Sequence, residues 1–490
     1  MKFTFYGHNC FVFNHDDTIL ITDPWFSKSG AFFGSWFQWP INHDFLDILI
    51  KKTLNKNVFI YLSHEHQDHF DLDTLKKFSK KTSFIIPNYN DKFLINKINK
   101  LGFNTIELND SQIFFLKDSF SIKLLIIDTG INHDSAAIIS IKDKIFINQN
   151  DCKIYDRLLT LNNKINFYSV QYSGANWHPN SFKSFNEEEK KKVSKIKVQN
   201  KISSIVKVLD KLKPDYYLPA AGPAIFPLLK EDLSLGIDNI FIHQDTLKKY
   251  LSKINTNIIY LKPGDDFSKN KKQPIMPPTL SELKNLKSKL PDFWKNLKTI
   301  LDKKKLIIEI NKRLAEISDL KFHESSLIIF KWGKNKKDGI TIDLNSFKAF
   351  DYIKDASKKF FLLEAEPKYF ALMTNDNLRW QDIYLSLRAS VTEEPPIFDN
   401  FVNIFVLSDV SNVRRGFLSV LEVSKERITK INPITKKKFT MKRYCPHNGS
   451  DLINADINEK NQLICPRHGW KFDLNNDGKC IVNNSSIESE

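Results

Sequence analysis

Short runs of apolar residues, separated by polar turns, dominate the first part of the chain. Asn, Asp and Lys flank these runs, as is typical of buried strands that alternate with turns. Between 186 and 212 the apolar positions recur at helical spacing until Pro214 ends the pattern, which predicts a long helix with a solvated, lysine-rich face. Together these patterns predict an α/β sandwich. The strand-like runs lie at 11–13, 19–21, 58–62 and 145–147.

Two breaks divide the rest of the chain. Lys, Asn, Gln and three prolines crowd into residues 268–278, and Glu393 to Pro396 form a second, acidic break that contains proline. Between the breaks, a helical stretch precedes strand-like runs and two further helices, which predicts a small α+β domain. Beyond the second break the sequence favours short strands. The predicted domains are therefore 1–268, 281–398 and 402–490.

Composition narrows the class of protein. With 490 residues, of which 41% are hydrophobic and 27% charged, the chain is long enough for roughly two to four globular domains and fits neither a disordered tail nor a membrane bundle. No apolar run reaches the roughly 18 residues of a membrane span, and the start does not resemble a leader. Five cysteines are too few for a disulfide framework. We therefore expect a cytoplasmic protein without a membrane span.

The excess of positive charge bears on the partners. Lys and Arg number 73 against 57 Asp and Glu, so the net charge is +16. Such a charge suits phosphates, anionic sugars or an acidic protein partner. The chain is also rich in Lys, Asn, Ile and Phe. Such a compositional bias can produce the same positive charge without selection for any ligand. We expect a small anionic substrate and no binding of nucleic acid.

The carboxyl-terminal part carries a metal-ligand pattern in two halves. Cys445 and His447 form a Cys-x-His segment, and after seventeen intervening residues Cys465 and His468 form a Cys-x-x-His segment. Two thiolates can hold one iron and two neutral imidazoles the other, which is the ligation of a Rieske [2Fe-2S] centre. A structural zinc site has the same composition, but it usually pairs Cys with Cys and His with His. The segment 402–490 thus resembles the Rieske family, which implies an all-β domain with these four side chains as cluster ligands.

A second ligand pattern follows the predicted strand that ends at Leu62. His64, His66, Asp68 and His69 lie within six positions, and so dense a set at a strand end can form the floor of a site for one or two metals. The segment resembles the H-x-H-x-D-H motif of the metallo-β-lactamase superfamily. That resemblance implies an αββα sandwich. It assigns the first two histidines to one metal, and the aspartate and the third histidine to the other.

The same resemblance supplies candidates for the remaining ligands. It implies metal-binding roles for His133 and His243, and it makes Asp151 a bridge between two metals. His178 is the alternative to His243 at the late ligand position. The early segments Gly7-His8 and Thr22-Asp23-Pro24-Trp25 resemble the start of the branch that includes the ascorbate-phosphate lactonases and the phospholipase D-like enzymes. We expect His8 to lie behind the ligands.

The pairing of the two centres bears on the metal. A Rieske centre moves single electrons, which Zn²⁺ cannot accept, so iron, as one or two ions, is expected at the first site. A Rieske domain joined to this lactamase branch resembles the CMP-N-acetylneuraminate hydroxylase family. The resemblance implies a monooxygenase that hydroxylates a small substrate such as CMP-sialic acid, using O₂ and a ferredoxin or cytochrome b5-type electron donor. Here the Rieske segment lies at the carboxyl end, whereas in the vertebrate hydroxylase it lies at the amino end.

Other classes of function stay open. A zinc hydrolase of the metallo-β-lactamase superfamily predicts activity without reductant or O₂, and a redox sensor or electron carrier predicts a first site without an open coordination position. Within the oxygenases, an amine, amide or lipid substrate is the alternative. The order of elements in 281–398 loosely resembles sterol-carrier-type lipid-binding modules, which bears on the lipid alternative alone. A homo-oligomer is compatible with the sequence.

Overall fold

The chain folds into two units. The computed structural model describes residues 1–130, 133–267, 273–321, 327–354, 359–375, 378–394, 399–422, 424–447, 449–467, 469–482 and 485–490. The first unit takes in the described residues of 1–128, 132–176 and 194–296. The second takes in those of 129–131, 177–193 and 297–490.

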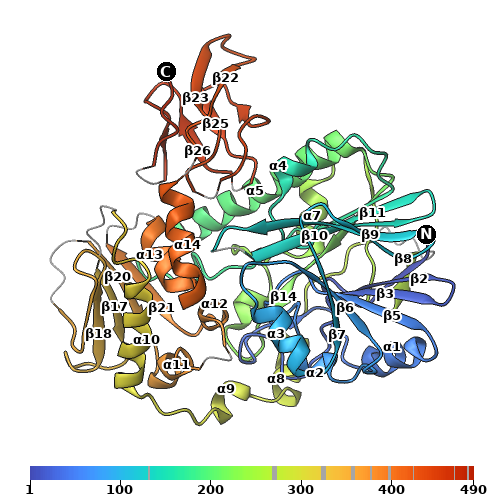
Figure 1. Ribbon diagram of the computed structural model, residues 1–490, viewed down its shortest axis with the longest axis horizontal. Helices are drawn as coiled ribbons and strands as arrows, with labels where there is room; N and C mark the ends of the chain where they lie inside the picture. The colour runs from blue at the N-terminus through green and yellow to red at the C-terminus, as the bar shows by residue number, and fades with distance from the viewer. Residues whose placement is uncertain are drawn as a thin grey trace. The chain divides into compact units, whose positions relative to one another are not determined.

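Two β-sheets form the framework of the first unit (Figure 1). Within the described residues each sheet has seven strands. The first has the order β16 (Asp265–Asp266), β1 (Phe3–Phe5), β2 (Phe11–His15), β3 (Thr18–Thr22), β5 (Asn57–Tyr61), β6 (Ser83–Pro87) and β7 (Asn104–Leu108). The second has the order β15 (Asn257–Ile258), β13 (Tyr216–Ala220), β12 (Phe167–Gln171), β11 (Lys144–Asn148), β10 (His133–Ile141), β9 (Phe120–Asp128) and β8 (Ile113–Lys117).

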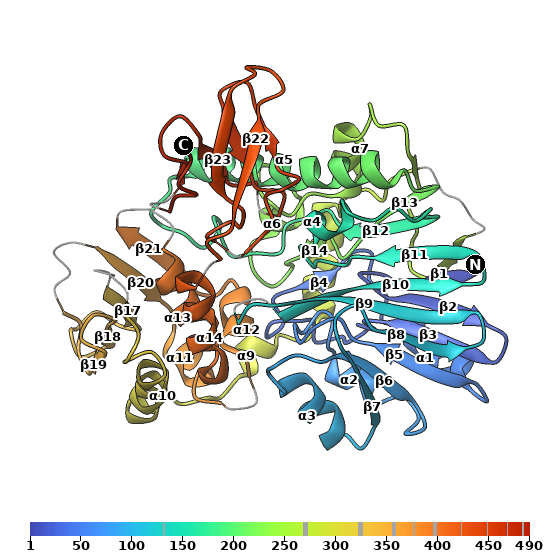
Figure 2. The same cartoon turned by 45° about the horizontal axis from the view of Figure 1, so that its top comes forward.

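Apolar side chains on alternate strand positions separate the layers. Leu20 lies in the core between the two sheets, whereas Ile19 and Ile21 on either side of it face the helical layer, as the two-residue period of a strand requires. Helices α1 (Phe45–Thr53) and α3 (Phe93–Lys100) cover the first sheet through buried leucines and isoleucines. Residues 194–212 of α5 (Glu187–Leu212) cover the second sheet (Figure 2). The αββα sandwich that the resemblance implied is confirmed.

Shorter elements complete the first unit. The two-stranded sheet pairs β4 with β14. The remaining elements are β4 (Phe37–Gln38), α2 (Leu72–Leu75), α4 (Tyr155–Leu158), β14 (Ala224–Ile225), α6 (Glu231–Ser234), α7 (Gln244–Tyr250), α8 (Leu280–Lys289) and α9 (Phe293–Asn296).

The second unit contains a five-stranded sheet and its helices, within the described residues. The sheet has the order β19 (Lys348–Phe350), β18 (Gly339–Asp343), β17 (Leu327–Lys331), β20 (Phe360–Glu364) and β21 (Ser390–Glu394). The helices are α10 (Lys303–Ala315), α11 (Pro367–Leu372), α12 (Trp380–Leu385), α13 (Asn400–Leu407) and α14 (Val410–Leu421). The strand-like runs predicted between the two breaks are confirmed in the described residues by β17, β18 and β20.

The carboxyl-terminal segment differs from its predicted strand-rich start. Residues 400–407 and 410–421 form α13 and α14, and the Asp399 side chain caps the first of these helices by accepting from the Val402 N–H at 3.1 Å. Strands begin only at Arg427. They are β22 (Arg427–Ile431), β23 (Lys438–Lys442), β24 (Asp456–Ile457), β25 (Gln462–Ile464), β26 (Lys471–Asp473) and β27 (Lys479–Cys480).

The bounds of these two units differ from the predicted domain boundaries. Residues 281–296 lie in the first unit, although they come after the predicted linker at 268–278. Residues 177–193 lie in the second unit, although they come before that linker. The three-domain division stays a prediction. Among the residues that the structure describes, no helix is both long and apolar enough to cross a membrane.

Glu393 is a buried acid in the second unit. Its backbone N–H donates to the Ser184 hydroxyl oxygen at 2.7 Å. Burial, together with repulsion from Asp399, raises the pKa of Glu393 from 4.5 to about 7. Because the pKa in the folded state lies above that in the unfolded state, the stabilising contribution is complete below pH 4.5. It is lost as the pH rises through about 7.

Replacing Glu393 by Gln removes this titration. We expect E393Q to be more stable than the wild type at pH 8, by up to about 3 kcal/mol, with the difference shrinking as the pH approaches 5. Urea unfolding of the full chain at both pH values measures it. E394Q, a change at the exposed neighbouring position of β21, is the control. Equal shifts for E393Q and E394Q would contradict the assignment.

Candidate metal centres

The ends of neighbouring strands bring the amino-terminal ligands together. The loop that holds the predicted histidine motif begins after β5, and within it the N–H groups of His69 and Phe70 donate to the carbonyl of His66 at 2.9 and 2.7 Å. Asp23 follows the parallel neighbour β3, and Asp151 follows β11 in the other sheet. The carboxyl ends of parallel strands are the usual position for ligand sites in α/β folds.

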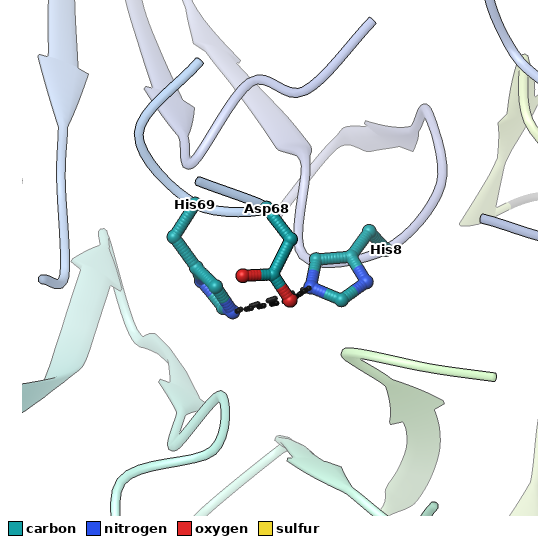
Figure 3. Close-up of side chains that lie close together, drawn as sticks. All are labelled: His8, Asp68 and His69. Atoms are coloured by element: carbon teal, nitrogen blue, oxygen red, sulfur yellow. Dashed lines mark hydrogen bonds and ion pairs between the residues drawn. The ribbon is translucent and has the colours of Figure 1, made fainter. Parts of the chain in front are cut away.

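One group of candidate ligands consists of His8, Asp68 and His69. Figure 3 shows the three side chains pointing toward one another. His8 Nε2 lies 3.2 Å from Asp68 Oδ2 and 3.2 Å from His69 Nε2. All three residues are buried. The structure therefore places His8 among the candidate ligands, whereas the sequence predicted a position behind them.

A second group consists of His64, His66 and Asp151. His64 Nε2 lies 2.7 Å from His66 Nδ1 and 3.8 Å from Asp151 Oδ2. The other oxygen of Asp151 lies 3.6 Å from His69 Nε2 in the first group. Asp151 thus lies between the two groups, at the position predicted for a bridging ligand.

Asp23 holds the histidine of the first group in place. Its Oδ2 lies 2.8 Å from His69 Nδ1 and accepts from the Ser63 hydroxyl at 2.6 Å and the Asn9 side-chain amide at 2.7 Å. Its Oδ1 accepts from the Ser63 N–H at 2.8 Å. A carboxylate on the far nitrogen of a ligating histidine fixes the ring and its tautomer. Sequence reasoning gave Asp23 no role.

Electrostatics across the two groups favour a positive charge. Burial disfavours a charged ring at His69, but Asp151, Asp68 and Asp23 outweigh it and raise the pKa of His69 to about 10. Burial works against the ionised form of Asp68 too, yet His69 and His8 hold its pKa below the usual range. The carboxylates therefore create a negative field, the property that a cation site needs.

Asp134 is a further acid beside the second group. Its Oδ1 lies 3.4 Å from His64 Nδ1. Burial, with repulsion from Asp151, raises the pKa of Asp134 above its usual range. The neighbouring residue His133 instead has Nδ1 2.7 Å from Asp128 Oδ1 on β9. Consecutive residues of a strand face opposite sides, which is why Asp134 rather than His133 reaches His64.

Three predicted histidines lie outside both groups of the described structure. His133 faces Asp128. His243 precedes α7, and its Nε2 lies 2.8 Å from the carbonyl oxygen of Ser234. His178, in the second unit, packs against the ring of Phe182 with centroids 4.7 Å apart. Their roles as metal ligands stay predictions that this geometry does not support.

Aromatic rings and one buried amide border the two groups. Trp25 packs edge-on against His8 at 5.1 Å between centroids, and Phe32 packs against His66 at 6.1 Å. Gln38 is 4% exposed, and within the described residues neither atom of its amide has a hydrogen-bond partner. It presses on Gly7, where a Cβ would lie only 2.5 Å from Gln38 Oε1. A buried amide without partners next to His8 points to a ligand.

Two loops of like geometry carry the carboxyl-terminal ligands. The N–H of Cys445 donates to Ser450 and that of Cys465 to Trp470, and each cysteine carbonyl accepts from the N–H four residues on, with N···O distances of 2.8 to 2.9 Å throughout. Both cysteines are fully buried, and their side chains hydrogen-bond to each other.

His447, one of the two predicted histidine ligands of this cluster, packs against an aromatic ring. The ring of His447 stacks on Trp470 with centroids 3.9 Å apart and an 18° angle between planes. His468, the fourth predicted ligand, lies outside the described residues. Burial, with the neighbouring Cys465 thiol, raises the pKa of Cys445. Two buried thiols in contact form a pair that a [2Fe-2S] cluster can use.

Comparison with known proteins assigns a domain type to each site. The model of the β-lactamase superfamily domain matches residues 2–149, and that of the Rieske [2Fe-2S] domain matches residues 403–487. The first match contains every residue of the two groups of metal ligands except Asp151, which follows its end by two positions. The second contains the two cysteine loops.

Two relatives span most of the chain. A protein of Mycolicibacterium smegmatis, provisionally named a Rieske 2Fe-2S iron-sulfur protein, is 24% identical over 526 residues that cover 98% of each chain. The cytidine monophosphate-N-acetylneuraminic acid hydroxylase of Asterias rubens is 22% identical over 438 residues, which cover 81% of this chain and 64% of its own. The chain therefore joins an amino-terminal domain of the β-lactamase superfamily to a carboxyl-terminal Rieske [2Fe-2S] domain, and it is a distant homologue of these hydroxylases and of the mycobacterial Rieske proteins.

Proposed function

We propose that this protein is a Rieske-dependent non-haem iron monooxygenase that hydroxylates a small substrate, in the manner of CMP-N-acetylneuraminate hydroxylase. The observation that carries the proposal is the presence, in one chain, of a Rieske domain and of two adjoining groups of His and Asp side chains. A Rieske centre moves single electrons, and Zn²⁺ cannot accept one. A redox-active metal gives the electron-transfer domain a use, so we assign iron to the amino-terminal site.

The side chains of the amino-terminal site fit such a cation. Ring nitrogens face each other in both groups, and the buried Asp68 Oδ1 has no hydrogen-bond partner among the described residues. Imidazole and carboxylate groups are ligands that iron accepts. Bound iron would supply the one-electron chemistry with O₂ that no side chain of the chain supplies. We assign one ion to His64, His66 and Asp151 and a second to His8, Asp68 and His69.

The cluster ligands follow from the two cysteine loops. We assign Cys445 and Cys465 to one iron of the [2Fe-2S] cluster, and His447 and His468 to the other. The contact between the two buried thiols supports the first assignment. The stacking of His447 on Trp470 supports the second, because it fixes the plane of that ring.

The residues around the first site have separate tasks in this proposal. Asp23 orients the ring of His69, and Asp134 lies against His64. Trp25 packs against His8 and Phe32 against His66, which limits the access of water to these two rings. A dry, shaped site limits side reactions of activated oxygen.

The proposed reaction consumes O₂, two electrons and two protons. One oxygen atom enters a C–H bond of the substrate, and the other leaves as water. A ferredoxin or cytochrome b5-type donor supplies the electrons one at a time. CMP-sialic acid is the first substrate to test, because the Asterias rubens relative is named for it, and amines, amides and lipids follow.

Metal analysis of anaerobically purified protein tests the assignment of iron. We expect iron beyond the two atoms of the cluster, together with an EPR signal of Rieske type that appears on reduction with dithionite. Turnover of substrate should then require both O₂ and reductant. Zinc at the first site, with activity that persists without O₂ or reductant, would return the chain to the hydrolases of the β-lactamase superfamily.

Replacing Asp23 by Asn tests the amino-terminal site separately. We expect D23N to bind its metal about 10- to 100-fold more weakly, because the ring of His69 loses its charged partner. Metal content after dialysis against a chelator measures this change, and the Rieske EPR signal should stay unaltered. D47N, at an exposed position of α1, is the matched control. A metal affinity in D23N equal to that of D47N would refute the role of Asp23.

A further inference from the structure

A lysine of α5 reaches the strand ends beside the metal groups. Val198, Ile202 and Ile205 of this helix pack on the second sheet. On the same helix, Lys201 directs its ammonium group to the end of β12, where it donates to Gln171 Oε1 and to the carbonyl oxygen of Ser173, the latter at 2.6 Å. Lys201 is half-buried. The packed helix therefore holds a positive charge at the carboxyl edge of the sheet.

Two hydrogen-bond donors beside the end of β12 lack an acceptor within the described residues. An ammonium group has three N–H donors, and two of those of Lys201 are used. Within the described part of the chain, the third has no partner. The hydroxyl of Ser173, a residue that is 1% exposed, also has no partner among the described residues. A buried hydroxyl without a partner, such as that of Ser173, points to a missing acceptor.

Backbone hydrogen bonds connect this point to both metal groups. The N–H of Gln171 donates at 2.7 Å to the carbonyl of Asn150, the residue before Asp151. On the other side, a Cβ at Gly222 would lie 2.9 Å from Ser173 Cβ. The preceding residue, Ala221, donates its N–H to the carbonyl of His8 at 2.7 Å. The strand end that Lys201 contacts is therefore hydrogen-bonded to the segment that holds Asp151. Ser173 lies against Gly222, whose neighbour Ala221 is hydrogen-bonded to His8.

Two further lysines add positive charge. Lys197 precedes Lys201 by one helical turn on α5, and Lys153 follows Asp151 by two residues. Burial, with repulsion from Lys153, lowers the pKa of both Lys197 and Lys201 to about 7. The three lysines lie within electrostatic reach of one another, beside the carboxylate of Asp151. A bound anion would offset their repulsion.

We propose that Lys201 and Ser173, with Lys197 and Lys153 nearby, form a subsite that binds an anionic group of the substrate, a phosphate or a carboxylate, next to Asp151. The anion accepts hydrogen bonds from the third N–H of Lys201 and from the Ser173 hydroxyl. A substrate held there by its charged end would place a neutral part against the metal groups. The link to substrate rests on the proposed function, whereas the binding of an anion does not.

Calorimetric titration of the full chain with inorganic phosphate, and separately with acetate, tests the subsite. We expect the wild type to bind at least one of the two anions. K201M should weaken that binding about tenfold or more, and S173A by a smaller factor, because a charged and a neutral donor are lost. K195M removes a lysine from the exposed face of the same helix and should bind as the wild type does. Circular dichroism confirms that the variants are folded.

The outcomes separate the sources of the anion and the two proposals. Preference for phosphate over acetate assigns the subsite to a phosphate group, and the reverse assigns it to a carboxylate. Binding that is equal in K201M, K195M and the wild type, or no binding of either anion, overturns the subsite. The metal content of the same samples is measured in parallel. Zinc in place of iron would defeat the proposed oxygenase and leave Lys201-dependent binding standing.

Discussion

The buried carboxylate of Asp23 is the interaction on which the amino-terminal site depends. It joins the segment after β1, through Asn9, to the loop after β5, through Ser63 and His69. An ionised carboxylate that is fully buried is tolerated only when its oxygens are hydrogen-bonded and a positive partner is near. Asp23 meets both conditions. In doing so it fixes the ring of His69, and with it the approach of His8 and Asp68.

The rest of the site follows from this fixed point. His69 Nε2 lies near oxygens of both Asp68 and Asp151, so the orientation of one ring relates the two groups of ligands. Aromatic side chains border the groups, and the lysines of α5 add positive charge at the edge of the second sheet. A site with a negative centre and a positive margin suits a cation and a substrate with an anionic end. The Rieske domain supplies the reason to expect a redox-active cation.

Local sequence patterns predicted the elements and the dense motifs. Leu20 and its neighbours follow the strand period, and α5 ends near the predicted residue, because both patterns depend on residues close in sequence. The motif from His64 to His69 is equally local. His8 lies between β1 and β2, Asp23 follows β3 and Asp134 lies on β10, and only the tertiary fold brings them to the motif.

Strand orientation explains a further difference between prediction and structure. A histidine motif alone could not tell which of His133 and Asp134 faces His64, since that depends on the register of β10. Within the described residues the amide of Gln38 and the third N–H of Lys201 have no partner, and neither feature left a mark in the sequence. Such features appear only when burial and hydrogen bonding can be read together.

The most direct test of the account is the fate of electrons placed on the Rieske cluster. The full chain is reduced under anaerobic conditions and mixed with O₂, and the visible absorption of the cluster reports its reoxidation. We predict that Asp151→Asn, with an intact Rieske EPR signal, slows this reoxidation at least about tenfold relative to the wild type, because electrons must pass to the amino-terminal site. Equal rates in both proteins would contradict the account, since the cluster would then react with O₂ on its own.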